Sequence, residues 1–248
     1  MSDKLIIFGD IHGCADELIN LLLETGFLPS ENAFNYSHPE NYKAVFVGDL
    51  TDRGPKSPLV LAIVQAMVKN GNALNVMGNH DDKLMRYLKG RNVTVSHGLD
   101  LTISQMDSGV MPEHRTDFKK GVLELFEKTP LYLILDEGRL VVAHAGLKEA
   151  FHGRDGGDVK TFCLYGDVEN GKKDESGFPI RKDWATEYSG QATVVFGHTV
   201  VDNVLVKNKT FNIDTGCVFG GSLSALIWPS LEIVQVKSKV TYSHRLNL

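Results

Sequence analysis

The sequence of 248 residues has few cysteines, no long hydrophobic run and little net charge. Its three cysteines, Cys14, Cys163 and Cys217, cannot all pair and show no Cys-x-x-Cys spacing, so neither a disulfide framework nor a thiolate zinc site is expected. The apolar runs are far shorter than the ~20 residues that a membrane-spanning helix needs. Near the N-terminus the apolar run after Lys4 is too short for a secretion signal. We therefore expect a soluble, cytoplasmic protein with no membrane partner.

The charged residues are nearly balanced, with 26 lysines and arginines against 31 aspartates and glutamates and a formal net charge of -5. A content of 42% hydrophobic and 23% charged residues is typical of a globular protein and not of a disordered tail. The balance also argues against an extended surface for long nucleic acids. The length suits one large domain, so residues 1–248 are predicted to form a single unit.

Short apolar runs that lead into a polar residue recur along the chain. They cover residues 4–8, 44–47, 73–77, 140–143, 193–196 and 211–213, and they are typical of buried strands. The polar residues that follow them are Asp10, Asp49, Asn79, His144, His198 and Asp214. Because open α/β sheets bind ligands at the carboxyl ends of their strands, these side chains are predicted to share one site.

Helical patterns separate the first three runs. One covers residues 15–25, and a second has Ser57 as the expected N-cap and Pro58 at the first helical position. This alternation predicts parallel strands with crossover helices, whereas the short strands after about residue 190 predict a mostly antiparallel sheet. The expected fold is α/β, with two face-to-face mixed β-sheets flanked by helices. Residues 153–182, rich in Gly, Asp and Lys, are predicted to form a long surface loop or flap.

The strand-end residues have the donor types of a dinuclear metal centre. With His12, which lies two residues after Asp10, the candidate ligands are Asp10, His12, Asp49, Asn79, His144 and His198. Any one histidine alone is more often a structural residue, but six such positions at strand ends favour two divalent ions. Oxygen and nitrogen donors without thiolate favour Mn²⁺, our first choice, with Ni²⁺, Co²⁺, Fe²⁺ or Zn²⁺ as alternatives.

Residues beside these ligands have side chains suited to phosphoryl transfer. Arg53 carries a planar fork that matches two phosphoryl oxygens. His80 is predicted to protonate a leaving oxygen, with Asp52 fixing its tautomer and raising its pKa. Asp81 and Asp82 are expected to cap a helix over residues 80–89.

Five further residues are candidates for the site, and four of them have a second interpretation. Arg181 is predicted to bind a phosphate chain, although a solvent-facing charge is an equal alternative. Trp184 and Tyr188 either stack on a base or, as we favour, cover a seam between a helix and a sheet. Asp214 and His97 are candidates for supporting a ligand histidine, while His97 also fits an ordinary turn.

Five motifs resemble, in order, the blocks of the calcineurin-like metallophosphoesterases in the phosphoprotein-phosphatase branch. They are GDIHG (9–13), GDLTDRG (48–54), GNHD (78–81), HAG (144–146) and GHT (197–199). The resemblance implies a four-layer sandwich and a first ion on Asp10, His12 and Asp49. It implies a second ion on Asp49, Asn79, His144 and His198. Catalysis would use His80, Asp52 and Arg53, and substrate binding would use Arg53, Asn79 and Arg181.

Other segments narrow the resemblance within that branch. Residues 80–90, 95–102, 163–168, 177–184 and 212–221 look like bacterial bis(5'-nucleosyl)-tetraphosphatases and also like the phosphatase domain of bacterial polynucleotide kinase-phosphatases. The first likeness implies a small substrate, diadenosine tetraphosphate, cleaved to ATP and AMP; symmetric cleavage would give two ADP. A protein Ser/Thr/Tyr phosphatase, a polynucleotide-end phosphatase and a non-catalytic nucleotide sensor are the alternatives. The oligomeric state is left open.

Overall fold

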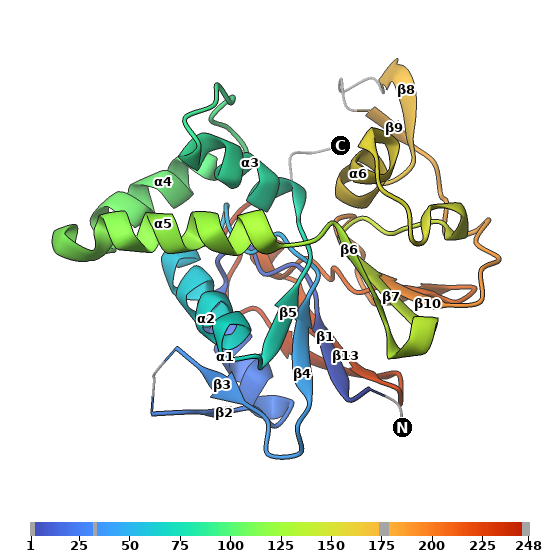
Figure 1. Cartoon of the computed structure of the whole chain (residues 1–248), viewed down its shortest axis with the longest axis horizontal. Helices are drawn as coiled ribbons and strands as arrows, with labels where there is room; N and C mark the ends of the chain where they lie inside the picture. Colours follow the sequence, from blue (N-terminus) through green and yellow to red (C-terminus); the bar gives the residue numbers. More distant parts are fainter. Residues whose placement is uncertain (1–2, 32–33, 174–178, 245–248) are drawn as a thin grey trace.

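Two five-stranded β-sheets lie at the centre of the structure (Figure 1). This computed structural model describes residues 3–31, 34–173 and 179–244. The first sheet has the strand order β14 (Glu232–Lys237), β13 (Ser222–Trp228), β1 (Leu5–Phe8), β4 (Lys43–Phe46) and β5 (Ala73–Asn75). β1, β4 and β5 are parallel, as the crossover pattern predicts, whereas β13 and β14 are antiparallel to their neighbours.

The second sheet is mixed as well. Its order is β11 (Leu205–Lys207), β12 (Thr210–Asn212), β10 (Thr193–Phe196), β7 (Leu140–Ala143) and β6 (Tyr132–Leu135). β10 is parallel to both β7 and β12, while the two outer pairs are antiparallel. The prediction of one mostly antiparallel sheet after residue 190 is therefore wrong. A strand's own pattern does not specify its partner, and β13 and β14 pair in the first sheet.

Residue alternation along the strands explains the layers. In β1, Leu5 and Ile7 pack in a cluster that joins the two sheets, whereas Ile6 and Phe8 pack toward the helices. In the second sheet, Val142 belongs to the shared cluster, and Val141 packs on the opposite face with Trp184. The predicted fold, two face-to-face mixed sheets flanked by helices, is confirmed.

Among the described residues, two helices pack on the first sheet, and three more pack on these helices and on one another. They are α1 (Ala15–Glu24), α2 (Ser57–Lys69), α3 (Asn79–Leu88), α4 (Leu99–Ser108) and α5 (Pro112–Lys128). Lys56 occupies the cap position of α2, so the expected N-cap Ser57 is instead its first residue. In the described ranges every helix is too short or too polar to span a lipid bilayer.

The segment predicted as a long loop contains regular structure. It includes helix α6 (Gly157–Tyr165) and the antiparallel strands β8 (Val168–Lys173) and β9 (Pro179–Arg181), while residues 174–178 lie outside the described ranges. Helix α6 forms because Val159, Phe162 and Cys163 are buried in the core cluster on the outer face of the second sheet. A second short hairpin joins β2 (Leu28–Pro29) and β3 (Tyr36–Ser37).

Candidate metal centre

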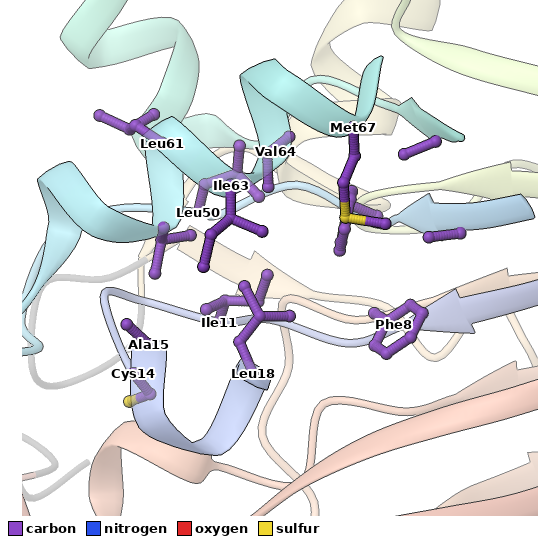
Figure 2. Packing of buried hydrophobic residues seen from close by; sticks show 14 of the residues in the cluster. Phe8, Ile11, Cys14, Ala15, Leu18, Leu50, Leu61, Ile63, Val64 and Met67 are labelled. Atoms are coloured by element: carbon purple, nitrogen blue, oxygen red, sulfur yellow. The ribbon is translucent and has the colours of Figure 1, made fainter. Parts of the chain in front are cut away.

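The predicted ligands are brought together by loops that follow strands of both sheets. The loops after β1 and β4 are joined by the backbone, where His12 N donates to Asp49 O at 2.8 Å. Ile11 and Leu50 lie next to predicted ligands and are fully buried in the helix-side core. Figure 2 shows both side chains below helix α2. Burial of these two apolar side chains thus fixes the loops, and the adjacent predicted ligands are held at the candidate metal centre.

Asp49 lies between two groups of possible ligands. Its Oδ2 atom is 3.5 Å from His12 Nε2 and 3.4 Å from His144 Nε2. His12, Asp49 and His80 form one group, and Asp49, His144 and His198 form the other; within each group the ligand atoms lie within 4.8 Å of one another. A carboxylate shared by both groups is the arrangement that a bridging ligand needs.

Backbone carbonyls determine which ring nitrogens face the site. His12 Nδ1 is 2.8 Å from Thr51 O, and His144 Nδ1 is 3.1 Å from Val47 O. Because a carbonyl oxygen only accepts, both Nδ1 atoms carry the proton, and both Nε2 atoms present a lone pair to the site. Such orientation by a carbonyl is usual for histidines that bind metals.

Other lone pairs surround His144 Nε2. It lies 2.9 Å from Asn79 Oδ1 and 3.4 Å from Asp49 Oδ2, both of which are acceptors. His198 Nδ1 is 3.0 Å away, and His198 Nε2 is buried with no hydrogen-bond partner among the described residues. Converging acceptors repel one another in the protein alone, whereas a cation among them would be stabilised. The residues present therefore fit a divalent ion.

Burial changes the protonation of these groups. It raises the pKa of Asp10, and the nearby charge of Asp214 raises it further. It also raises the pKa of Asp49, with Asp81 as the next cause. It lowers the pKa of His144 to about 3, so that this imidazole is neutral at physiological pH, as a metal ligand must be.

Asp10 is held by the loop that carries His198. The two carboxylate oxygens accept His198 N at 3.1 and 3.2 Å. Asp214, at the end of the neighbouring strand, accepts Gly216 N at 3.1 Å. It is thus a charged neighbour of Asp10, and its predicted support of a ligand histidine stays a prediction.

Several predicted site residues have left-handed backbone conformations. The φ angles are +46° at His12, +50° at Asp49, +74° at Asp52, +67° at Arg53 and +68° at His198. Each such non-glycine residue costs roughly 1–3 kcal/mol, and such residues concentrate at functional sites. The surrounding fold therefore holds these side chains in place at an energetic cost.

His80 and Asp52 form a buried pair, as predicted. His80 Nδ1 is 2.6 Å from Asp52 Oδ2, and Thr102 Oγ1 donates to Asp52 Oδ1 at 2.7 Å. Burial raises the pKa of Asp52 to about 6. It lowers the pKa of His80, with the Arg53 charge as the next cause, which corrects our expectation that Asp52 raises it. Burial and the charges of neighbouring groups, Arg53 first, therefore determine the direction of this pKa shift.

Arg53 points into the site. Its Nη1 donates to His12 Nε2 at 2.6 Å, the lone pair that a metal ion would use. The guanidinium carbon of Arg53 also lies 5.5 Å from the centre of the Phe219 ring, and this cation–π contact helps to hold the side chain in place. Arg181, from β9, lies at the rim, with Nη1 3.4 Å from Thr199 Oγ1, one residue after His198.

The remaining candidates divide between the site and the framework. Tyr188 is buried and donates to Ala192 O at 2.9 Å, which confirms the seam interpretation for that residue. Trp184 packs on Phe162 of α6 and also lines a cavity beside His198. His97 is exposed, with Nδ1 2.9 Å from Ser96 Oγ, as an ordinary turn histidine would be.

The two expected helix caps differ. Asp81 accepts Gly78 N at 3.2 Å, as a cap does, and also accepts Leu50 N at 3.0 Å. Asp82 pairs with Arg86 and Lys160 instead, so its predicted capping role is wrong. It lies one position further along the helix, where its side chain faces these cations.

Sequence reasoning missed two residues at the site. Thr102 is fully buried and donates to Asp52; it ends the 95–102 segment, in which no residue was assigned this role. Tyr165 lies at the end of α6 with its ring centre 6.4 Å from that of His198. The segment 163–168 contains Tyr165, but no strand pattern precedes it, so the strand-end rule did not find it.

Comparisons with known proteins agree with this geometry. The model of the calcineurin-like phosphoesterase family matches residues 4–202. Proteins named bis(5'-nucleosyl)-tetraphosphatase PrpE (asymmetrical) are similar over nearly their whole length. That of Geobacillus sp. is 43% identical over 96% of each chain, and that of Anoxybacillus flavithermus is 46% identical over 95% of each chain. A crystal structure provisionally named a diadenosine tetraphosphatase superposes with a TM-score of 0.65 at 27% identity, covering 96% of this chain and 95% of the other.

Proposed function

This chain belongs to the calcineurin-like phosphoesterase family, and we propose that it hydrolyses dinucleoside polyphosphates, cleaving diadenosine tetraphosphate to ATP and AMP. It is a metal-dependent hydrolase. The main support for this substrate is the 43 to 46% sequence identity, over nearly the full length of both chains, to relatives named for that reaction. The converging donors of both sheets support the same proposal.

We assign two divalent ions to the donors. Asp10, His12 and Asp49 would hold the first, and Asp49, Asn79, His144 and His198 the second. The family uses divalent ions, and our first choice is Mn²⁺ because the donors are carboxylate, amide and imidazole. When bound, such ions supply Lewis acidity toward a phosphoryl oxygen and a water nucleophile.

Side chains of the protein bind the phosphate chain and transfer the proton. Arg53 binds phosphoryl oxygens through its guanidinium fork. In its imidazolium form, His80 gives the Nε2 proton to the bridging oxygen that leaves with the nucleotide and becomes neutral, while water adds to phosphorus as that bond breaks. Asp52 accepts the Nδ1 proton of His80, which leaves Nε2 as the atom for proton transfer. Asn79 and Arg181 contact the phosphate chain.

Parallel assays of the full chain test the proposal. We would measure kcat/KM for diadenosine tetraphosphate, a phosphopeptide, a 2',3'-cyclic nucleotide and p-nitrophenyl phosphate, with Mn²⁺, Ni²⁺, Co²⁺ or Mg²⁺ supplied. The highest kcat/KM for the dinucleotide with Mn²⁺ is expected. A higher kcat/KM for the phosphopeptide would contradict the proposed substrate and indicate a protein phosphatase. If p-nitrophenyl phosphate is not hydrolysed with any of the metals, the alternative of a non-catalytic nucleotide sensor would be supported.

A further inference from the structure

A cavity of about 260 Å³ opens beside His198 on the outer side of the second sheet. Residues 181–185, which follow β9, form one side of it, and strands β10, β11 and β12 contribute the other. Tyr165 and His198 both line it, so the cavity is continuous with the candidate metal centre. A substrate held at that centre therefore has direct access to the cavity.

The walls of the cavity are largely apolar. Trp184 and Phe196 are nearly buried, with ring centres 5.0 Å apart, and both line it. Leu205, on strand β11, closes another side and is 41% exposed. Flat apolar walls of this kind suit the faces of a nucleobase, because base stacking on aromatic side chains is favourable for every base.

The charged residues that line the cavity are three cations and two carboxylates: Arg181, Lys182, Lys207, Asp167 and Asp183, of which Lys207 and Asp183 form an ion pair. Arg181 lines the cavity and lies beside Thr199. Thr199 directly follows the candidate ligand His198, which lines the same cavity, so the guanidinium lies between the cavity and the metal centre. With Asp183 paired to Lys207, two cations face one carboxylate, so a ligand with an anionic part next to a flat apolar part suits this lining.

We propose that this cavity binds the base and ribose of one nucleoside of the substrate, while Arg181 contacts the adjoining phosphates. Drug-sized ligands occupy pockets of about 300–1,000 Å³, so a cavity of about 260 Å³ suits one nucleoside and not a whole dinucleotide. The inference rests on the proposed function and extends it. The metal centre contacts only phosphoryl groups, whereas this cavity discriminates nucleotides from other phosphate esters.

Filling the cavity provides the test. Leu205→Trp places an indole in it, whereas Val206→Trp adds the same ring at the next position of β11, which does not line the cavity and is 52% exposed. With the Mn²⁺-loaded full chain, Leu205→Trp is expected to raise KM for diadenosine tetraphosphate roughly tenfold, the effect of losing one stacked base. Val206→Trp leaves that KM unchanged, and both variants keep kcat/KM for p-nitrophenyl phosphate. Equal KM values in the two variants would overturn the proposal.

Inhibition separates this inference from the substrate assignment. AMP should inhibit p-nitrophenyl phosphate hydrolysis by the native chain roughly tenfold more strongly than ribose 5-phosphate, which lacks the base, and Leu205→Trp should abolish the difference. Equal inhibition by the two compounds would overturn the nucleoside site. If the native chain shows the AMP preference but does not cleave diadenosine tetraphosphate, the nucleoside site stands and the proposed substrate fails.

Discussion

At the scale of single residues, position 197 must be glycine because the Asp10 carboxylate occupies the space that a side chain there would need. A Cβ atom on Gly197 would lie 1.8 Å from Asp10 Oδ1, although the backbone there is not left-handed. Gly197→Ala is therefore expected to displace a proposed ligand and to weaken Mn²⁺ binding by roughly 10–100-fold, as loss of ligand support does elsewhere. Isothermal titration with Mn²⁺ measures the change.

Gly157 is the matched control for that substitution. A Cβ atom on Gly157 meets nothing within 4 Å, and the residue opens helix α6. Gly157→Ala should keep the native Mn²⁺ affinity. Native affinity in Gly197→Ala would show that Asp10 does not bind the ion.

His80 allows the proton transfer to be tested apart from metal binding. His80→Asn should keep both ions and lose roughly 10²–10⁴ of the rate with diadenosine tetraphosphate, because the leaving oxygen then lacks a general acid. The loss should be much smaller with p-nitrophenyl phosphate, whose leaving group needs little protonation. Measured kcat values that fall equally on both substrates would exclude the general-acid role.

Sequence patterns located residues at the ends of strands and missed those that act through another side chain. Asp10, Asp49 and His198 each follow an apolar run and a glycine, and the structure places all three at one site. Thr102 has no such signal, because it lies in helix α4 and reaches Asp52 only through the fold. The lowered pKa of His80 was also out of reach, since it depends on burial.

At the scale of elements, the loop between β1 and α1 depends on one buried side chain. Ile11 lies between Asp10 and His12 and is fully buried in the helix-side core (Figure 2). Ile11→Ala is expected to lower the free energy of unfolding by about 2–4 kcal/mol through the cavity it leaves. Mn²⁺ affinity should fall as well, because the loop is then less firmly held.

Urea denaturation of the metal-free chain measures the first effect, with Ile134→Ala as the control. Ile134, in β6, is 42% exposed, so its truncation should change the free energy of unfolding by less than about 1 kcal/mol. Equal destabilisation by the two variants would contradict the anchoring role of Ile11.

Strand positions were predictable, whereas strand partners were not. The runs at 140–143 and 193–196 match β7 and β10 to the residue. The pairing of β13 with β1 joins residues more than 200 positions apart in the chain, and no local pattern encodes it. Helix α6 was missed because Gly and Asp surround it, and its apolar residues are held by tertiary packing.

At the scale of the whole molecule, Asp136 connects the two sheets. It lies in the turn between β6 and β7 and accepts Trp228 Nε1, at the end of β13, at 2.8 Å. Burial raises its pKa, but hydrogen bonds from Asp3 N and Trp228 Nε1 and the charge of Arg139 outweigh this, so the pKa is lowered overall. The ionised carboxylate is thus the form that stabilises the folded chain.

A lowered pKa has a definite consequence for acid stability. The contribution of Asp136 is complete above the unfolded value of about 3.9 and is lost as the pH falls through the lower folded value. Asp136→Asn should therefore be less stable than the native chain by about 1–3 kcal/mol at pH 7. Urea denaturation should show this difference shrinking below about pH 4; a difference that stays constant with pH would contradict the account.

The two sheets also meet at the metal centre, so ions should stabilise the whole fold. Asp49 follows a strand of the first sheet and His144 a strand of the second, yet they share one group of donors. Saturation at 100 times Kd adds about 2.7 kcal/mol of stability. Mn²⁺ should raise Tm relative to EDTA-treated protein, and the shift should shrink in His144→Asn. An equal shift in that variant would place the stabilising ion elsewhere.

The formal net charge of -5 describes the whole chain and not the local charge at the metal centre. Arg53 lies at the metal centre and Arg181 at its rim, and bound divalent ions would make the centre strongly cationic. A small polyphosphate therefore suits the site better than a long nucleic acid does.

Product analysis tests the central claim most directly. Mn²⁺-loaded native chain is incubated with diadenosine tetraphosphate, and the nucleotides are separated by anion-exchange chromatography at early times. We predict that the native chain forms ATP and AMP in equal amounts. The His80→Asn variant should form both products much more slowly than the native chain. ADP as the sole product, or no cleavage while p-nitrophenyl phosphate is hydrolysed, would contradict the account.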